Sequence, residues 1–169
     1  DTYALLVRNI ALNGYDNIVP VQKADSNQPG TATFFLHPNE VGHSLHPETL
    51  GRSKTAITVE TTTLDRFFEG EGWPPVHLVK MDIEGAEPAA LEGMTEVLQR
   101  CGDLRLIFEY IPRILQRAGE NPRQLLEKVK GMGFTIQNIT DGHGLQPLSE
   151  KVLRDSNLRA ELFCERKNS

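Results

Sequence analysis

The chain has 169 residues, of which 38% are hydrophobic and 24% are charged, a balance typical of one globular domain with a sizeable core. Its formal net charge of -5 provides no basic surface for phosphates, so we expect neither nucleic acid nor an anionic membrane as a partner. No apolar run approaches the roughly 20 residues that span a bilayer, and the first residues do not resemble a signal peptide.

Cysteine usage gives no sign of a disulfide-stabilised, secreted fold. The two cysteines, Cys101 and Cys164, lie far apart in the sequence, and one disulfide would not define a chain of this length. We therefore expect a reducing, cytoplasmic setting. Because the chain begins with Asp1 rather than Met, we expect a processed chain or a fragment. The sequence leaves open whether copies of the chain form a homo-oligomer.

The first half of the chain is expected to contain two helices and three strands. Apolar side chains recur at a helical spacing in residues 2–13, Asn13-Gly14 is a typical helix stop, and a short second helix is expected at 64–68. Residues 37–53 show no periodicity and are expected to form a loop. The predicted strands are residues 17–24, 31–36 and 56–61.

The second half alternates between strand and helix patterns. The predicted strands are residues 76–81, 104–110, 134–139 and 161–165. The predicted helices cover residues 88–99 and a segment from Asn121-Pro122, an N-cap pair, to Gly133. Such alternation favours a mostly parallel sheet with helices on both faces. We therefore predict an α/β fold in a single domain over residues 1–169.

An acidic turn directly after the predicted strand 76–81 carries the strongest functional signal. Ligands of open α/β sheets bind beyond the carboxyl ends of the strands, where this strand delivers Asp82 and Glu84. Glu109 ends the next core strand and is expected to face the same crevice. Three carboxylates there could orient a substrate hydroxyl or amine, act as a general base, or hold a divalent cation. Glu87 could instead stabilise the start of the next helix.

The same residues resemble a known family, the FkbM-type methyltransferases. The family pattern is a T-x-L-D segment, then K-x-D-x-E-G-x-E before a helix with Leu-x-Gly, then a strand that ends in Glu. The corresponding residues here are Thr61–Asp65, Lys80–Glu87, Leu91, Gly93 and Glu109. The resemblance covers nearly the whole chain. It implies an S-adenosylmethionine-dependent O-methyltransferase with a Rossmann-like sheet, acting on a hydroxyl of a small molecule or sugar.

One part of the family pattern is absent from this chain. The glycine-rich turn and the acidic residue that hold the cofactor in the family should precede residues 2–13. We therefore expect a Rossmann-like sheet that lacks its N-terminal strands, with part of the cofactor pocket. The cofactor contacts that the resemblance leaves are Ala24 and Asp25, whose alternative role is a plain turn, and Asp82 near the transferred methyl group.

The resemblance also implies residues on the acceptor side. His43 and Ser44 lie in the segment that covers the substrate in the family, and Glu87 is a further candidate for acceptor binding. The histidines around His43 match no closed structural zinc spacing, so we predict no metal there.

The predicted reaction is in-line methyl transfer, in which Asp82 or Glu84 accepts the hydroxyl proton and Glu109 supports them. Two alternatives stay open. One is a divalent-metal-dependent enzyme that uses the same three carboxylates. The other is a non-catalytic binding module, suggested by the incomplete cofactor pattern.

Overall fold

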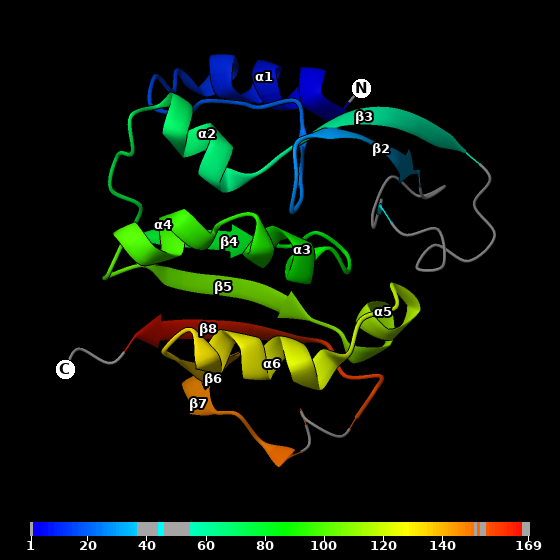
Figure 1. Cartoon of the computed structure of the whole chain (residues 1–169), viewed down its shortest axis with the longest axis vertical. Helices are drawn as coiled ribbons and strands as arrows, with labels where there is room; N and C mark the ends of the chain where they lie inside the picture. The colour runs from blue at the N-terminus through cyan, green and yellow to red at the C-terminus, as the bar shows by residue number, and fades with distance from the viewer. Residues whose placement is uncertain (1, 37–43, 46–54, 151, 153–154, 167–169) are drawn as a thin grey trace.

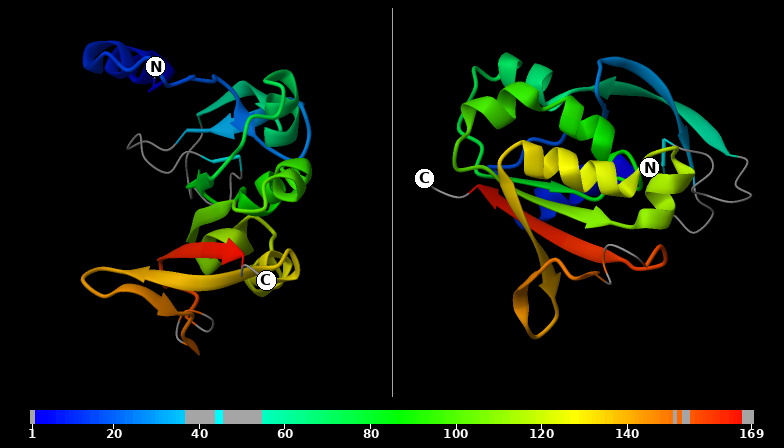
Figure 2. Two further views of the ribbon diagram at one scale, coloured as in Figure 1. Left: turned by 90° about the vertical axis from the view of Figure 1, so that its left-hand side faces the viewer. Right: turned by 60° about the horizontal axis from the view of Figure 1, so that its bottom comes forward.

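The computed structural model describes residues 2–36, 44–45, 55–150, 152 and 155–166, and it divides into two layers of elements stacked along its long axis (Figures 1 and 2). The first layer contains a three-stranded sheet and two helices: α1 (Thr2–Asn13), β1 (Ala24–Asp25), β2 (Gly30–Phe35), β3 (Ala56–Thr62) and α2 (Leu64–Gly70). The second layer contains a five-stranded sheet and four helices: β4 (Leu78–Met81), α3 (Glu87–Glu92), α4 (Thr95–Arg100), β5 (Arg105–Tyr110), α5 (Pro112–Arg117), α6 (Pro122–Gly131), β6 (Phe134–Thr140), β7 (Gly144–Pro147) and β8 (Ala160–Arg166).

Strand directions within the two sheets are mixed. The small sheet has the order β1-β3-β2, with β1 parallel and β2 antiparallel to β3. The large sheet has the order β4-β5-β8-β6-β7, in which β4 runs parallel to β5. The pairs β5–β8, β6–β8 and β6–β7 are all antiparallel. The carboxyl ends of β4 and β5 therefore lie side by side.

The α/β class is right, but the prediction of a mostly parallel, Rossmann-like sheet with helices on both faces is wrong. Four of the six strand pairings among the described residues are antiparallel. The physical reason is the way in which the strands are connected. A parallel pair requires a long crossover, whereas antiparallel strands need only a short turn. β6 and β7 are joined by the turn at residues 141–143, where Gly142 has a φ of +73°, and no crossover helix separates them.

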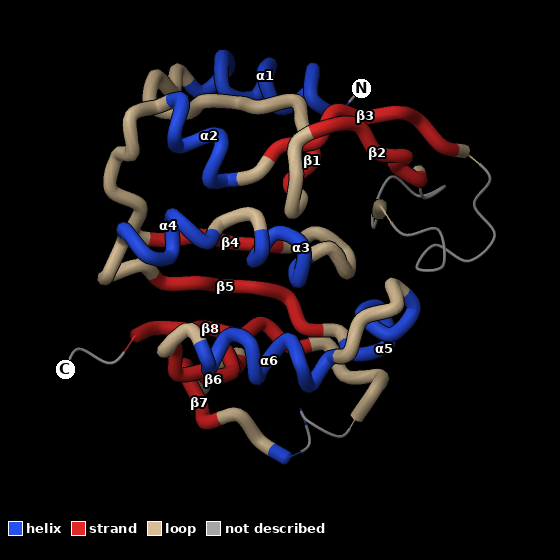
Figure 3. The backbone as a smooth tube through the Cα atoms, in the orientation of Figure 1, coloured by secondary structure: helices blue, strands red, loops and turns tan. Residues whose placement is uncertain are grey.

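The helices of the second layer cover one face of the large sheet. Buried strand residues with matching register, among them Met81, Phe108 and Leu162, share this face. In Figures 1 and 3, α3, α4 and α6 lie over it, and their apolar residues Leu91, Val97 and Val129 join the same core. Lys80 and Glu161, which alternate with these core positions, are exposed on the other face.

Several element boundaries differ from the sequence-based prediction. Of the predicted strand 17–24, only Ala24 pairs, and it does so in the two-residue strand β1. Pro20 has no N–H for a ladder bond, which disfavours pairing in the middle of this segment. The predicted helix 88–99 is two short helices, α3 and α4, which are separated at Gly93 and Met94. The helix α5 and the strand β7 were not predicted. Most of the predicted loop 37–53 lies outside the described residues.

Both cysteines are free thiols, as expected. No helix within the described ranges has the length and apolar character needed to cross a bilayer.

Candidate functional site

The turn after β4 leaves the strand through two consecutive left-handed residues, Glu84 with a φ of +53° and Gly85 with a φ of +98°. Left-handed backbone is costly for residues other than glycine, by roughly 1–2 kcal/mol. At Gly85 a side chain would also crowd α5, since a Cβ atom there would lie 3.1 Å from Ile114 Cγ2. The E-G pair therefore forms the sharp exit that turns the chain from β4 into α3.

This exit brings together the three predicted carboxylates. One carboxylate oxygen each from Asp82, Glu84 and Glu109 lies within 4.8 Å of the other two. Asp82 is exposed, Glu84 is partly buried and Glu109 is buried. The convergence expected from neighbouring strand ends is thus present, because β4 and β5 are parallel and in register up to Met81 and Phe108. Oxygen ligands at this spacing can hold a proton or a hard divalent cation.

Glu109 is the buried member of the cluster and forms an ion pair with Arg159, which precedes β8. Burial raises the pKa of Glu109 above its ordinary value. The charges of Asp82 and Glu84 add to this rise, and the guanidinium of Arg159 opposes it. The charge state of Glu109 therefore depends on neighbours from two segments, the turn after β4 and the residue before β8.

A cavity of about 490 Å³ opens next to the cluster, between the small sheet and the turn after β4. Asp82 lines it together with Ala24 and Asp25 at the end of β1, so the structure brings all three predicted cofactor contacts to one cavity. The remaining lining is largely apolar, and its polar members are Thr2, Gln22 and Lys23. The apolar part comes from residues Tyr3, Val21, Phe34, Leu45, Val59, Ile83 and Ala86. Burial raises the pKa of Asp25 to about 6; the N–H of Ser26 opposes this rise, and the Asp65 charge adds to it.

Glu87 is turned into the protein rather than into the cavity. Its carboxylate accepts hydrogen bonds from the backbone N–H groups of Ile83 at 3.3 Å and Gly85 at 3.1 Å. Burial raises its pKa to about 7, although these hydrogen bonds oppose the rise. Glu87 is the first residue of α3, as the alternative of a residue that stabilises the helix start requires, and its carboxylate also holds the preceding turn in shape. Acceptor binding by Glu87 stays a prediction.

Ser44 is also buried, and it contacts the acidic turn directly. Its hydroxyl donates to the carbonyl oxygen of Glu84 at 2.9 Å, and its backbone pairs with Phe35 at the end of β2. Ser44 therefore stabilises the backbone of Glu84, the left-handed residue of the turn. Its neighbour His43, the other predicted acceptor contact, lies outside the described residues.

Comparison with family models decides the relationship. The model of the methyltransferase FkbM domain matches residues 1–136. The chain belongs to the FkbM methyltransferase family. Comparisons with curated proteins and with solved structures gave no match.

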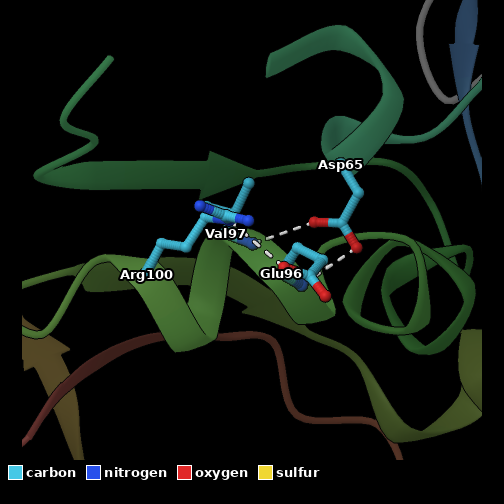
Figure 4. Close-up of polar contacts among 4 residues, drawn as sticks. All are labelled: Asp65, Glu96, Val97 and Arg100. Carbon is cyan, nitrogen blue, oxygen red and sulfur yellow. Dashed lines mark hydrogen bonds and ion pairs between the residues drawn. The ribbon is translucent and has the colours of Figure 1, made fainter. Parts of the chain in front are cut away.

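Two of the segments that carry the FkbM resemblance have structural roles in this chain. Thr63 caps α2 by accepting the N–H of Arg66, and Asp65 accepts the N–H groups of Glu96 at 3.0 Å and Val97 at 2.9 Å at the start of α4 (Figure 4). Gly93 lies so close to the chain after β1 that a Cβ atom would be 2.1 Å from the carbonyl oxygen of Ser26. Asp65 and Gly93 thus join the two layers.

Arg159 is the site residue that the sequence reasoning missed. It lies beyond the matched residues 1–136 and 50 positions from Glu109 in the sequence. Its position follows from the pairing of β8 with β5, in which Ala160 is opposite Tyr110. A single arginine before a strand gives no local signal, so only the sheet register could have revealed it.

Proposed function

We propose that this FkbM-family chain carries the acceptor side of an S-adenosylmethionine-dependent O-methyltransferase acting on a hydroxyl of a small molecule or sugar. The observation that carries the proposal is that Asp82 belongs both to the carboxylate cluster and to the lining of the 490 Å³ cavity. A proton acceptor is thereby adjacent to a space suited to a ligand, since sites for drug-sized ligands are roughly 300–1,000 Å³.

The chemistry of the cavity fits S-adenosylmethionine. Its largely apolar walls suit the adenosine part, and its two carboxyl groups, Asp25 and Asp82, suit hydroxyl donors and a cationic sulfonium or amino group. Ala24 and Asp25 would hold the adenine end, and Asp82 would lie near the methyl group. When bound, the cofactor supplies a methyl group on positively charged sulfur, which an oxygen nucleophile can take without a covalent enzyme intermediate.

The residues of this chain would orient the acceptor and remove its proton. The acceptor hydroxyl would bind at the cluster of Asp82, Glu84 and Glu109, and its proton would pass to a carboxylate oxygen of Asp82 or Glu84 as the new oxygen–carbon bond forms. Glu109, which is more deeply buried, would support the orientation of the acceptor. Ser44 and Glu87 would stabilise the turn that carries Glu84.

Calorimetric titration with S-adenosylmethionine tests this proposal. Asp25→Asn and Asp82→Asn are each expected to weaken cofactor binding by about tenfold or more, equivalent to ~1.4 kcal/mol, because each removes a charge from the cavity wall. Asp103→Asn, at an exposed position outside the residues that line the cavity, is the matched control and should bind like the parent chain. Absence of binding, or equal binding by all four proteins, would contradict the proposal.

A divalent-metal-dependent enzyme is the second candidate, and the spacing of the three carboxylates favours it. The ion pair between Arg159 and Glu109 argues against it, because a cation already neutralises the buried carboxylate. Repeating the titration with Mg²⁺ or Mn²⁺ in place of the cofactor separates the two: cation binding that Asp82→Asn and Glu84→Gln abolish would favour the metal enzyme. A chain that binds neither ligand would point to the binding-module alternative.

A further inference from the structure

Arg159 and Glu109 form an unequal ion pair. The Glu109 side chain is 5% exposed and the Arg159 side chain is 69% exposed, so a solvent-facing cation reaches down to a carboxylate that has lost most of its water. Exposed ion pairs contribute little to stability. A buried charge without a partner, by contrast, is costly and tends to be neutralised by a proton. The pair therefore matters for the charge of Glu109 more than for the stability of the fold.

The charges around Glu109 come from each element that packs there. Asp82 and Glu84 from the turn after β4 both disfavour a negative charge on Glu109, and the Glu87 carboxyl at the start of α3 interacts with it unfavourably as well. On the exposed sheet face, Lys80 of β4 is engaged by Glu161 of β8 at 3.2 Å. Among the described residues, Arg159 is the cation whose contact with Glu109 the structure shows.

We propose that Arg159 is a positioning residue of the acceptor site, which keeps Glu109 ionised and turned toward Asp82 and Glu84. The inference rests on the proposed function, and it assigns a role in that site to the segment before β8, outside the matched residues 1–136. With Arg159 in place, the ionised form of Glu109 is favoured, and its carboxylate can accept a hydrogen bond from an acceptor. Without Arg159, the buried Glu109 is shifted toward its protonated form, which donates a hydrogen bond instead.

Carboxyl ¹³C NMR titration of the chain tests this assignment without any requirement for methyl transfer. Glu109→Gln identifies the Glu109 resonance by its loss. Arg159→Gln is expected to move the Glu109 titration midpoint to higher pH. Arg159→Lys, which keeps the charge but loses the planar fork, should move the midpoint in the same direction by a smaller amount. Arg105→Gln removes an exposed arginine from the opposite end of β5 and should leave the midpoint unchanged.

The same variants carry a second readout in the methyl-transfer assay. The acid limb of the pH profile of kcat/KM should move to higher pH in Arg159→Gln, in step with the NMR midpoint, while cofactor affinity stays that of the parent chain. An unchanged Glu109 midpoint in Arg159→Gln overturns the inference. A chain that does not bind S-adenosylmethionine overturns the proposed function instead, and the NMR titration still decides the role of Arg159.

Discussion

Glu87 is buried in the turn between β4 and α3, with both carboxylate oxygens directed at backbone N–H groups. Two effects act on it in opposite directions. Loss of water favours the protonated form, and the N–H donors favour the ionised form. Loss of water is the larger effect, so Glu87 is half-protonated near pH 7 rather than near pH 4.5. The protonation state of Glu87 therefore changes with pH, and the hydrogen bonds that hold the turn change with it.

The stability of the protein should depend on pH through Glu87. Because the folded pKa of Glu87 is raised from 4.5 to about 7, the unfolded chain releases this proton earlier than the folded chain as pH rises. The Glu87 contribution to the free energy of unfolding is thus fully present below pH 4.5. It is lost between pH 4.5 and about 7, by on the order of 3 kcal/mol. Glu87→Gln should show a flatter profile in urea titrations across this window.

Glu120→Gln, a change at an exposed glutamate, is the control and should keep the slope of the parent chain. Parallel profiles for Glu87→Gln and the parent would show that Glu87 does not titrate in this range in the folded protein.

At the scale of elements, α4 depends on a cap that comes from another helix. Asp65, the second residue of α2, accepts two N–H groups at the start of α4, and its own N–H donates to the carbonyl oxygen of Gly93 at 2.9 Å. Figure 4 shows the Asp65 carboxylate facing the first turn of α4. A six-residue helix is not stable by itself in water, so α4 depends on this tertiary cap and on the burial of Val97 and Leu98.

Asp65→Ala should therefore lower the free energy of unfolding by about 1–2 kcal/mol, the usual cost of losing a helix cap. Glu96→Gln removes the exposed ion pair with Arg100 in the same helix and should cost less than about 0.5 kcal/mol. Urea unfolding followed by circular dichroism measures both. Equal effects of the two changes would mean that Asp65 is no more than a surface charge.

The sequence predicted those elements whose patterns are local. Residues 2–13 form α1, and Asn121 caps α6 as expected, with its side chain accepting the N–H groups of Arg123 and Gln124. The carboxylate cluster was also predictable, because strand ends are visible in the pattern and Glu109 follows a clear apolar run. Strand direction was not, since it depends on how β8 inserts between β5 and β6, which no local pattern encodes.

The whole molecule is held around its cavity by the contact between the two layers. Gly93 is at the end of α3 in the second layer, and Ser26 follows β1 in the first, and their backbones touch. The carbonyl of Ser26 cannot move away freely, because the backbone N–H of Ser26 donates a hydrogen bond to the carbonyl oxygen of Thr62 at 2.9 Å. The separation of the layers, and with it the width of the cavity, is thus set at a position that has no side chain.

Gly93→Ala tests this contact, since the added methyl group would lie 2.1 Å from the Ser26 carbonyl oxygen and must push the layers apart. We expect a loss of at least ~1–3 kcal/mol of stability, as for overpacking in a core. Gly131→Ala, at the end of α6 with no atoms within 4 Å of the added carbon, is the matched control and should be neutral or stabilising by up to ~1 kcal/mol. Equal melting temperatures for the two variants would contradict the role of Gly93.

At Glu84, the backbone conformation and the side chain call for different residue types. A backbone φ of +53° is a conformation that glycine adopts without cost, and glycine is in fact the next residue. The chain nevertheless has a glutamate at this position, with its side chain brought within reach of two other carboxylates. The backbone at this position therefore favours glycine over glutamate. What the chain obtains by having Glu84 here is a third carboxylate at the cluster, presented by a residue in a strained backbone conformation.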